Sequence, residues 1–158
     1  MNKLTHIDEQ GRPVMVDISE KNVSLRSALA RSVVSLPAKV LEQLINDDLQ
    51  TKKGPVFQTA IIAGIMAAKK TGELIPLCHP LGLDNCNIEI HINEQKEVVI
   101  DCTAKITAKT GVEMEALVGA SIAALTVYDM CKALSQDIVI KETRLMQKTG
   151  GKSDFKRT

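Results

Sequence analysis

Hydrophobic and polar positions alternate most regularly in two runs, residues 87–92 and 98–106, which a short polar segment at 93–96 separates. The apolar positions are Ile88, Ile90, Ile92, Val98, Ile100, Cys102, Ala104 and Ile106. Successive side chains of a strand point to opposite faces, so the alternation places all of these residues on one face. The pattern predicts an antiparallel hairpin with that face buried.

Apolar residues recur at helical spacing in two segments, and a third segment is apolar nearly all round. The first predicted helix begins at Pro37 and ends at Asn46-Asp47-Asp48, and the second runs from Phe57 to Lys70 and stops at Thr71-Gly72. The third is Glu113–Leu134. Because its middle is apolar on most sides, we expect this helix to be buried by its own sheet and by another subunit.

The remaining segments complete an α+β arrangement, with helices packed against an antiparallel sheet. Residues 14–18 predict a short strand and residues 138–146 a last strand. Residues 25–36 are ambiguous, because Ala and Leu favour a helix while every second position fits one face of a strand. Lys52–Pro55 predicts a loop, and Pro76–Pro80 predicts a stiff loop because proline fixes its own φ.

Length and composition are those of one globular domain that covers residues 1–158, with residues 1–13 as a mobile arm. Hydrophobic residues make up 44% of the chain, which excludes a disordered protein. A net charge of +1 and an aromatic content of 2% argue against a nucleic-acid partner. We expect no membrane partner, because the apolar run at 116–128 is too short to cross a bilayer. No secretory signal opens the sequence, so we expect a cytoplasmic protein.

The cysteines predict reduced thiols, and no metal site is expected, because no pair has the CxxC spacing of structural zinc. Cys86, Cys102 and Cys131 lie in apolar stretches and are interpreted as small core residues. Cys78 precedes His79 in the proline-flanked loop. His79 can donate to a phosphate or act as an acid or base, and the alternative is a histidine exposed by chance.

The charge is concentrated at one end. Residues 141–158 hold six basic and two acidic residues, net +4, whereas residues 1–140 sum to −3. Within this end, Lys148-Thr149-Gly150-Gly151-Lys152-Ser153 is interpreted as a glycine-rich anion-binding loop at the start of a basic, partly flexible tail, residues 148–158. The alternative is a flexible surface loop. A P-loop is excluded, because its first glycine and its following helix are missing.

Two groups of charged residues lie on the predicted 113–134 helix. Asp129 and Lys132 are three residues apart and share a face, so in a buried helix each would shift the pKa of the other. The alternative is a simple ion pair at a helix end. Glu113 and Glu115 can accept adjacent N–H groups from a guanine or pterin edge, and the alternative is helix-dipole stabilisation.

Together these groups suit a phosphorylated, nitrogen-rich heterocycle that undergoes acid–base rearrangement. No GxGxxG sequence is present, so hydride transfer from a dinucleotide is not predicted. Two other classes remain as hypotheses. A non-catalytic nucleotide-binding regulator would need the lysines but no acid–base pair, and an RNA-binding tail would show steep salt dependence.

Six stretches of the sequence carry a family resemblance: MVDIS at 15–19, KKGPVFQTAIIAGI at 52–65, LIPLCHPL at 74–81, KTGVEMEAL at 109–117, LTVYDMCKA at 125–133 and KTGGKS at 148–153. Over nearly its whole length the sequence resembles the cyclic pyranopterin monophosphate synthase family, the molybdenum cofactor biosynthesis protein C or MoaC family. The resemblance implies a ferredoxin-like α+β fold with residues 25–36 in the sheet. It also implies a homohexamer, a trimer of dimers with its sites at dimer interfaces.

The implied reaction converts the GTP derivative 3′,8-cyclo-7,8-dihydro-GTP into cyclic pyranopterin monophosphate and pyrophosphate, within molybdenum cofactor biosynthesis. No cofactor is implied, and a need for Mg²⁺ with the triphosphate stays open. The resemblance assigns catalysis to Asp129, Lys132, Lys53, Lys148 and His79. It assigns substrate contacts to Leu77, Cys78, His79, Glu113, Met114, Glu115 and Lys152. Here Ser153 runs straight into Asp154, where the family often has a glycine between them, so the tail beyond Lys152 is a less secure site element.

Overall fold

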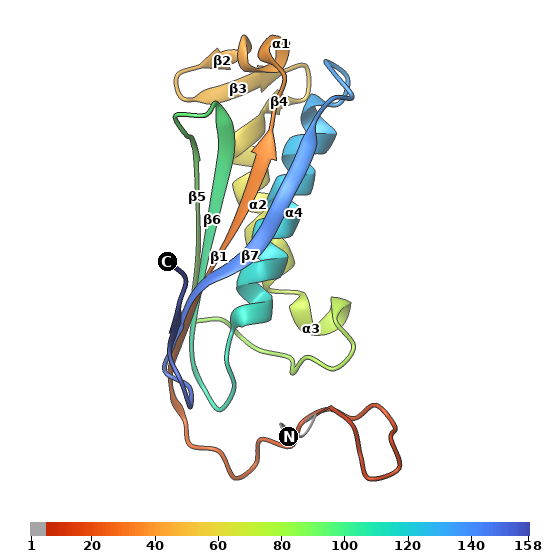
Figure 1. The fold of residues 1–158 in the computed structure, drawn as a ribbon, viewed down its shortest axis with the longest axis vertical. Helices are drawn as coiled ribbons and strands as arrows, with labels where there is room; N and C mark the ends of the chain where they lie inside the picture. The colour runs from red at the N-terminus through yellow and green to blue at the C-terminus, as the bar shows by residue number, and fades with distance from the viewer. Residues whose placement is uncertain (1–5) are drawn as a thin grey trace.

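A five-stranded antiparallel sheet forms one layer of the protein, and two helices cover one of its faces (Figure 1). The structure is a computed structural model that describes residues 6–158. The strand order is β5-β6-β1-β7-β8. The bounds are β1 Ser24–Ser35, β5 Asn85–Ile92, β6 Glu97–Ala108, β7 Val139–Thr149 and β8 Phe155–Lys156. The α+β class predicted from the sequence is confirmed.

The β5–β6 hairpin has the predicted register. Ile88 lies opposite Cys102 and Ile90 opposite Ile100, so the alternating apolar positions share one face. On β6 this face is buried from Val98 to Ile106. Strand β1 lies between β6 and β7, and its Ala28, Ala30, Ser32 and Val34 are buried on the same face. The strand implied by the resemblance at residues 25–36 is therefore confirmed against the local helix propensity.

Helices α2 (Val56–Ala68) and α4 (Glu113–Cys131) form the second layer. α4 packs on β1, β6, β7 and α2, which explains why its sequence is apolar nearly all round. It ends at Cys131, three residues before the predicted end. By length and composition its 19 residues are sufficient to cross a membrane, contrary to the expectation from the shorter apolar run. More than half of this stretch is buried inside the protein, as in the core helix of a globular domain.

The two helices meet through glycines. A Cβ added at Gly64 of α2 would stand 2.7 Å from the carbonyl oxygen of Gly119 on α4 and 3.1 Å from the Cβ of Ala123. Gly64 is buried, and the sequence offered only its presence inside a helix as a sign of close packing.

Gly64→Ala should therefore destabilise the fold, although alanine is the better helix former. The expected loss in the free energy of unfolding is about 1–3 kcal/mol, the usual cost of overpacking, reduced by the gain in helix propensity. Denaturant unfolding measures it. Gln58→Ala, at an exposed position of the same helix, is the control and should change stability by less than about 0.5 kcal/mol. A Gly64→Ala variant more stable than the wild type would contradict the packing argument.

The predicted helix from Pro37 is wrong beyond its first turn. α1 covers only Ala38–Leu41, and a small sheet follows: β2 Leu44–Ile45, β3 Asp48–Thr51 and β4 Gly54–Pro55. Asn46 and Asp47 have φ of 50° and 62° and form the turn between β2 and β3. These two residue types tolerate the left-handed region, so the segment interpreted as a helix stop is a hairpin turn. Of the predicted 52–55 loop, residues 52–53 form a tight turn, and Gly54–Pro55 is strand β4, which pairs with β3.

Asp48 has a role that the sequence did not indicate. Its buried carboxylate accepts hydrogen bonds from the backbone N–H groups of Phe57 (2.7 Å) and Gln58 (3.1 Å). It thus caps the N-terminus of α2 from outside that helix, where the dipole favours an anion. At the other end of α2, Thr71-Gly72 does not stop the helical structure as predicted. After a turn at residues 69–70, a short helix α3 covers Thr71–Leu74.

Residues 14–18 form no strand, contrary to the prediction. They have no regular secondary structure, and the carbonyl of Val16 accepts a hydrogen bond from His79. Of the predicted 1–13 arm, residues 1–5 lie outside the described residues. Residues 6–13 form a turn closed by a bridge between Ile7 and Pro13, and the mobility of the arm stays a prediction. At the C-terminal end, β7 continues to Thr149, and β8 pairs back onto it, a strand that the sequence did not predict.

Candidate active site

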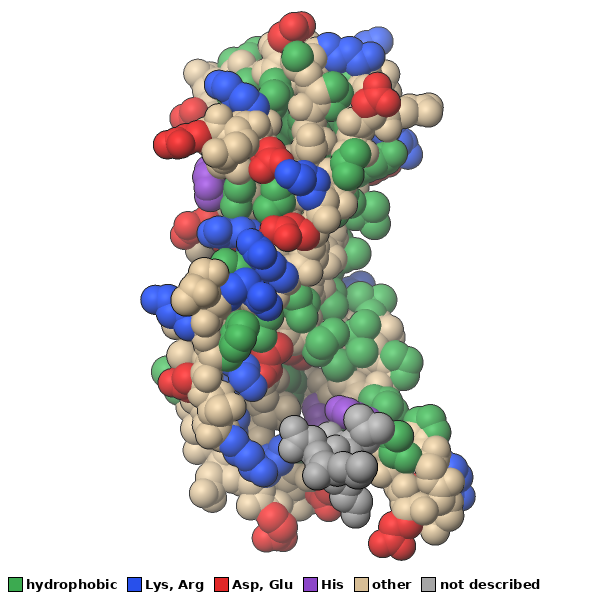
Figure 2. Space-filling model, viewed as in Figure 1, with side chains coloured by type: hydrophobic (Ala, Val, Ile, Leu, Met, Phe, Trp, Pro, Cys, Tyr) green, Lys and Arg blue, Asp and Glu red, His purple; other side chains and the backbone are tan. Residues whose placement is uncertain are grey.

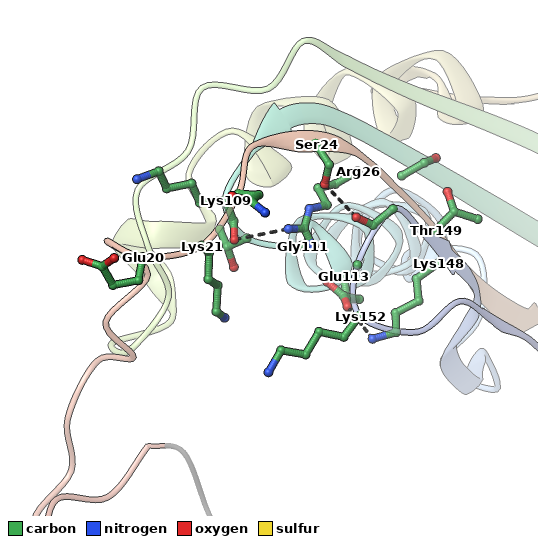
Figure 3. A pocket seen from close by; sticks show the side chains of 15 residues that line it. Glu20, Lys21, Ser24, Arg26, Lys109, Gly111, Glu113, Lys148, Thr149 and Lys152 are labelled. Carbon is green, nitrogen blue, oxygen red and sulfur yellow. Dashed lines mark hydrogen bonds and ion pairs between the residues drawn. The ribbon is translucent and has the colours of Figure 1, made fainter.

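A cleft with two adjoining lobes lies at the end of the sheet where β1 and α4 begin and β7 ends. The larger lobe, of about 670 Å³, is lined mainly by residues 20–27, 109–113 and 148–152, and we call it the basic lobe (Figure 3). The smaller lobe, of about 280 Å³, is lined by residues of the 77–81 loop, the 16–21 segment and the start of α4, and we call it the His79 lobe. Lys21, Thr110, Gly111 and Glu113 line both.

Cations from separate elements line the basic lobe. They are Lys21, Arg26, Lys109, Lys148 and Lys152. The Nζ atom of Lys148 lies 3.2 Å from Oε1 of Glu113. Figure 2 shows Lys and Arg side chains gathered on the side of the molecule where β7 and the C-terminal segment run, whereas hydrophobic side chains cover much of the helix side. Five cations against the acids Glu20 and Glu113 make this lobe suited to a polyanion.

Arg26 is a residue of this lobe that sequence reasoning missed. Its Nε atom is buried and has no hydrogen-bond partner among residues 6–158, and its Nη2 donates a 3.4 Å hydrogen bond to the carbonyl of Lys109. An unpaired buried donor is costly, so its presence beside a cleft indicates a ligand position. The sequence held a signal, because Arg26 occupies the same strand face as the core residues Ala28 and Ala30.

The glycine-rich loop is held firmly on β1. Gly150 has φ of 88°, and a Cβ there would stand 2.9 Å from the carbonyl carbon of Leu25. Ser24 Oγ donates to the carbonyl of Gly150 (2.7 Å), and the Gly150 N–H donates to Asp154 Oδ1 (3.1 Å). Asp154, at the position where the sequence departs from the family, therefore stabilises the loop that carries Lys152.

The His79 lobe contains a histidine with a defined tautomer. His79 Nε2 lies 2.8 Å from the carbonyl oxygen of Val16, which can only accept. Nε2 therefore carries a proton, and Nδ1 is left as the acceptor of the neutral ring. Burial raises the pKa of the neighbouring Cys78 thiol, and the negative charge of Glu115 raises this pKa further. The Cys78 thiol is therefore not activated as a nucleophile.

The first turn of α4 supplies both lobes with carboxylates. Glu115 is almost fully buried, and burial raises its pKa, with Glu113 raising this pKa further. Leu77, Cys78, His79, Met114 and Glu115 line the His79 lobe, and Lys148 and Lys152 line the basic lobe. The structure therefore brings together eight of the predicted site residues, Glu113 included, in one cleft. No group of three or more His, Cys, Asp or Glu in residues 6–158 is arranged to hold a metal ion.

The other three predicted residues form a separate cluster at the C-terminal end of α4. Asp129 accepts from Lys132 Nζ at 2.8 Å and from Lys53 Nζ at 2.9 Å. Hydrogen bonds from Lys132 and then from Lys53 lower the pKa of Asp129 to about 2, and Asp129 in turn raises the pKa of Lys132. The expectation of a buried pair is wrong for the single chain, because the Asp129 side chain is 52% exposed. Hydrogen bonding and charge, not an apolar environment, cause the shift.

One chain does not join these two clusters. Glu113 and Asp129 lie on the same straight helix, and a rise of 1.5 Å per residue separates them by about 24 Å along its axis. A nucleotide is too short to contact both ends. The cleft and the Lys53–Asp129–Lys132 cluster, which we call the lysine–aspartate cluster, therefore belong to different ends of the molecule.

Comparison with known proteins identifies the family. The model of the MoaC family matches residues 15–151, which include every predicted site residue except Lys152. The chain belongs to the MoaC family. A protein of Xanthomonas campestris pv. campestris (strain 8004) named "Cyclic pyranopterin monophosphate synthase" is 54% identical, and the match covers 97% of this chain and 93% of that protein.

Two further relatives of this MoaC chain are longer proteins. "Molybdenum cofactor biosynthesis protein 1" of Dictyostelium discoideum is 50% identical over 96% of the chain, and the chain spans 27% of its length. "Molybdenum cofactor biosynthesis bifunctional protein" of Synechocystis sp. is 51% identical over 98% of the chain, which spans 46% of that protein. The unit described here thus corresponds to part of larger proteins in some relatives and to almost the whole protein in others.

Proposed function

We propose that the chain converts 3′,8-cyclo-7,8-dihydro-GTP into cyclic pyranopterin monophosphate and releases pyrophosphate. The observation that carries this proposal is the two-lobed cleft, in which a lobe with five cations adjoins a lobe with a histidine and a buried carboxyl group. A 54% identical relative of nearly the same length bears the name of this activity. The small-molecule substrate therefore has a phosphate end and a ring end that match the two lobes.

The basic lobe would hold the triphosphate. Lysine presents a compact positive charge, and arginine can bind two oxygens of a phosphate at once. When the sugar hydroxyl attacks the α-phosphate, the P–O bond to the pyrophosphate breaks and negative charge builds up on the leaving group. Lys148, Lys152 and Arg26 would stabilise that charge.

The His79 lobe would hold the guanine-derived ring. Glu113 and Glu115 would accept N–H groups from the ring edge, and Met114 and Leu77 would contact its faces. Burial that raises the pKa of Glu115 would also let it carry a proton more readily than an exposed carboxyl group. His79, whose Nδ1 is the acceptor of the ring, would take a proton from the substrate.

The lysine–aspartate cluster would enter the site from a second copy of the chain. The separation of about 24 Å along α4 supports this, because a single chain cannot bring the cluster to its own cleft. Exposed apolar side chains on the helices, Ile62, Met66 and Leu125, support burial of that side by another copy. The homohexamer implied by the resemblance provides such pairs of chains, and together with a cytoplasmic location it stays a prediction.

Within the cluster, the low pKa of Asp129 keeps it ionised, and the raised pKa of Lys132 keeps that lysine protonated. Lys132 or Lys53 would then donate a proton to the opening ring, and Asp129 would hold the two ammonium groups in place. The direct test supplies the purified chain with 3′,8-cyclo-7,8-dihydro-GTP and assays both products. Tight binding with no turnover would instead support a non-catalytic nucleotide-binding regulator.

Lys148→Ala should lower turnover by at least ~100-fold, since one preorganised charge at a developing anion has an effect of this size. Binding of the unphosphorylated nucleoside analogue should change little, because Lys148 is assigned to the phosphates. Steady-state kinetics and calorimetry measure the two quantities. Lys156→Ala, an exposed lysine of β8 outside the cleft, is the matched control. A parallel loss of turnover and nucleoside binding would mean that Lys148 holds the cleft together instead.

A further inference from the structure

Gly111 lies between β6 and α4 and lines both lobes of the cleft. It has no side chain that could contact a ligand, so the reason for a glycine at this position must be conformation or space. Its φ lies outside the left-handed region, so its backbone conformation is open to other residues. The requirement is one of space. A Cβ at this position would stand 2.8 Å from Cδ of Glu113 and closer still to Oε2, and the three nearest atoms all belong to the Glu113 carboxyl group.

The other glycines with close neighbours meet different atoms. Added Cβ atoms at Gly64, Gly72 and Gly150 would first meet backbone or core side chains. Among residues 6–158, a polar side chain of the cleft occupies the space of the missing Cβ at two glycines only: the Glu113 carboxyl group at Gly111 and, 3.1 Å away, Arg26 at Gly151. A side chain at position 111 would therefore clash with the Glu113 carboxylate and not with the core.

That carboxylate has a fixed place. One oxygen of Glu113 lies 3.2 Å from Nζ of Lys148, and the other lies over Gly111 (Figure 3). Glu113 and Lys148 are both about two-thirds shielded from solvent. A side chain at position 111 would push the carboxylate away and remove the counter-ion from Lys148. Glu113 is also the carboxylate that the two lobes share, so its direction affects both.

We infer that Gly111 is a positioning residue: the absence of its side chain creates the notch that directs the Glu113 carboxylate toward Lys148 at the junction of the two lobes. Its effect on turnover rests on the proposed function, whereas its effect on the charge of the basic lobe does not. The inference predicts that a methyl group at position 111 acts only through Glu113.

A double-mutant cycle between Gly111→Ala and Glu113→Ala tests this. Gly111→Ala should lower turnover at least ~10-fold in the wild-type background, because small misplacements of reacting groups have effects of this size. In the Glu113→Ala background the same change should alter turnover by less than about twofold, because the displaced carboxylate is absent. Equal losses in both backgrounds, or no loss in either, would overturn the inference. Gly82→Ala, at an exposed glycine with nothing near its missing Cβ, is the matched control.

Binding of inorganic pyrophosphate by calorimetry provides a second arm that needs no turnover. Glu113→Ala should tighten this binding about threefold, since removal of a partly exposed counter-ion frees Lys148. Gly111→Ala should change the affinity in the same direction, and the double variant should not exceed Glu113→Ala alone. If the chain fails to convert the proposed substrate, this arm still decides the role of Gly111. Weaker binding in Gly111→Ala, or additive effects in the double variant, would refute it.

Discussion

Mixed assemblies of Asp129→Asn and Lys148→Ala chains should recover turnover that neither variant has alone. If each site combines the cleft of one chain with the lysine–aspartate cluster of another, a pair of unlike chains has one site with both changes and one intact site. Random mixing makes half of the pairs unlike, so about a quarter of the sites should be intact in a two-fold symmetric pair. Co-expression, confirmation of mixed assemblies by native mass spectrometry and a turnover assay measure the recovery.

The control pairs two changes at the same end. His79→Ala and Lys148→Ala both lie in the cleft of one chain, so every site in their mixed assemblies lacks one of the two residues. No recovery is expected for this mixture. Recovery in the control, or its absence in the test mixture despite confirmed mixed assemblies, would show that the sites are not composed in this way.

Asp129→Asn should reduce turnover by at least ~100-fold while the chain folds and assembles normally. The change keeps the shape and removes the charge that holds Lys53 and Lys132 together, at distances of 2.9 and 2.8 Å. Because the Asp129 side chain is half exposed, its loss should leave the unfolding transition nearly unchanged. Single-turnover kinetics and thermal unfolding measure the two effects.

The pH dependence follows from the direction of the shift. The pKa of Asp129 is lowered to about 2, so the group stays ionised at every pH above about 4. Any change in wild-type turnover between pH 4 and 7 must therefore come from the titration of another group. The Asp129→Asn variant should show the same pH dependence in this range. Asp137→Asn, an exposed acid beyond the end of α4, is the control and should keep full turnover. If the folded Asp129→Asn variant turned over at nearly the wild-type rate, the lysine–aspartate cluster would have a structural role and not a catalytic one.

The sequence predicted best where one local rule acts alone. Strict alternation specifies the β5–β6 hairpin because a shift of one residue would expose the isoleucine face. The helix predicted from Pro37 failed because Asn46 and Asp47 suit a hairpin turn as well as a helix stop, and only pairing with β3 decides between them. Asp48 was interpreted as part of the same helix stop. Its actual partner is the N-terminus of α2, and this contact forms only in the folded structure.

The candidate site shows the same division. Its residue types were evident from the sequence, but they were interpreted together as one site, and the separation of Glu113 from Asp129 along α4 was not predicted. The pairing of Lys53 with Asp129 was not predicted either, because the two residues are 76 positions apart and meet only through the β3–β4 turn. Arg26 was missed because the alternation of the strand places it on the buried face but does not show what surrounds a cation there.

The five-stranded sheet has two unlike edges, and this bears on how the chain behaves before it is fully folded. At one edge β8 pairs only with Gln147 and Lys148, so the start of β7 is also unpaired on that side, but it carries the charged residues Lys141, Glu142 and Arg144, which protect an edge. At the other edge β5 offers an eight-residue strand with which no strand pairs in residues 6–158. An open edge is a template for strand addition by other chains. In the folded protein, α2 covers the isoleucine face and Glu89 and His91 stand on the other. Until α2 docks, both faces of β5 are open, so aggregation during synthesis or refolding should begin at this strand.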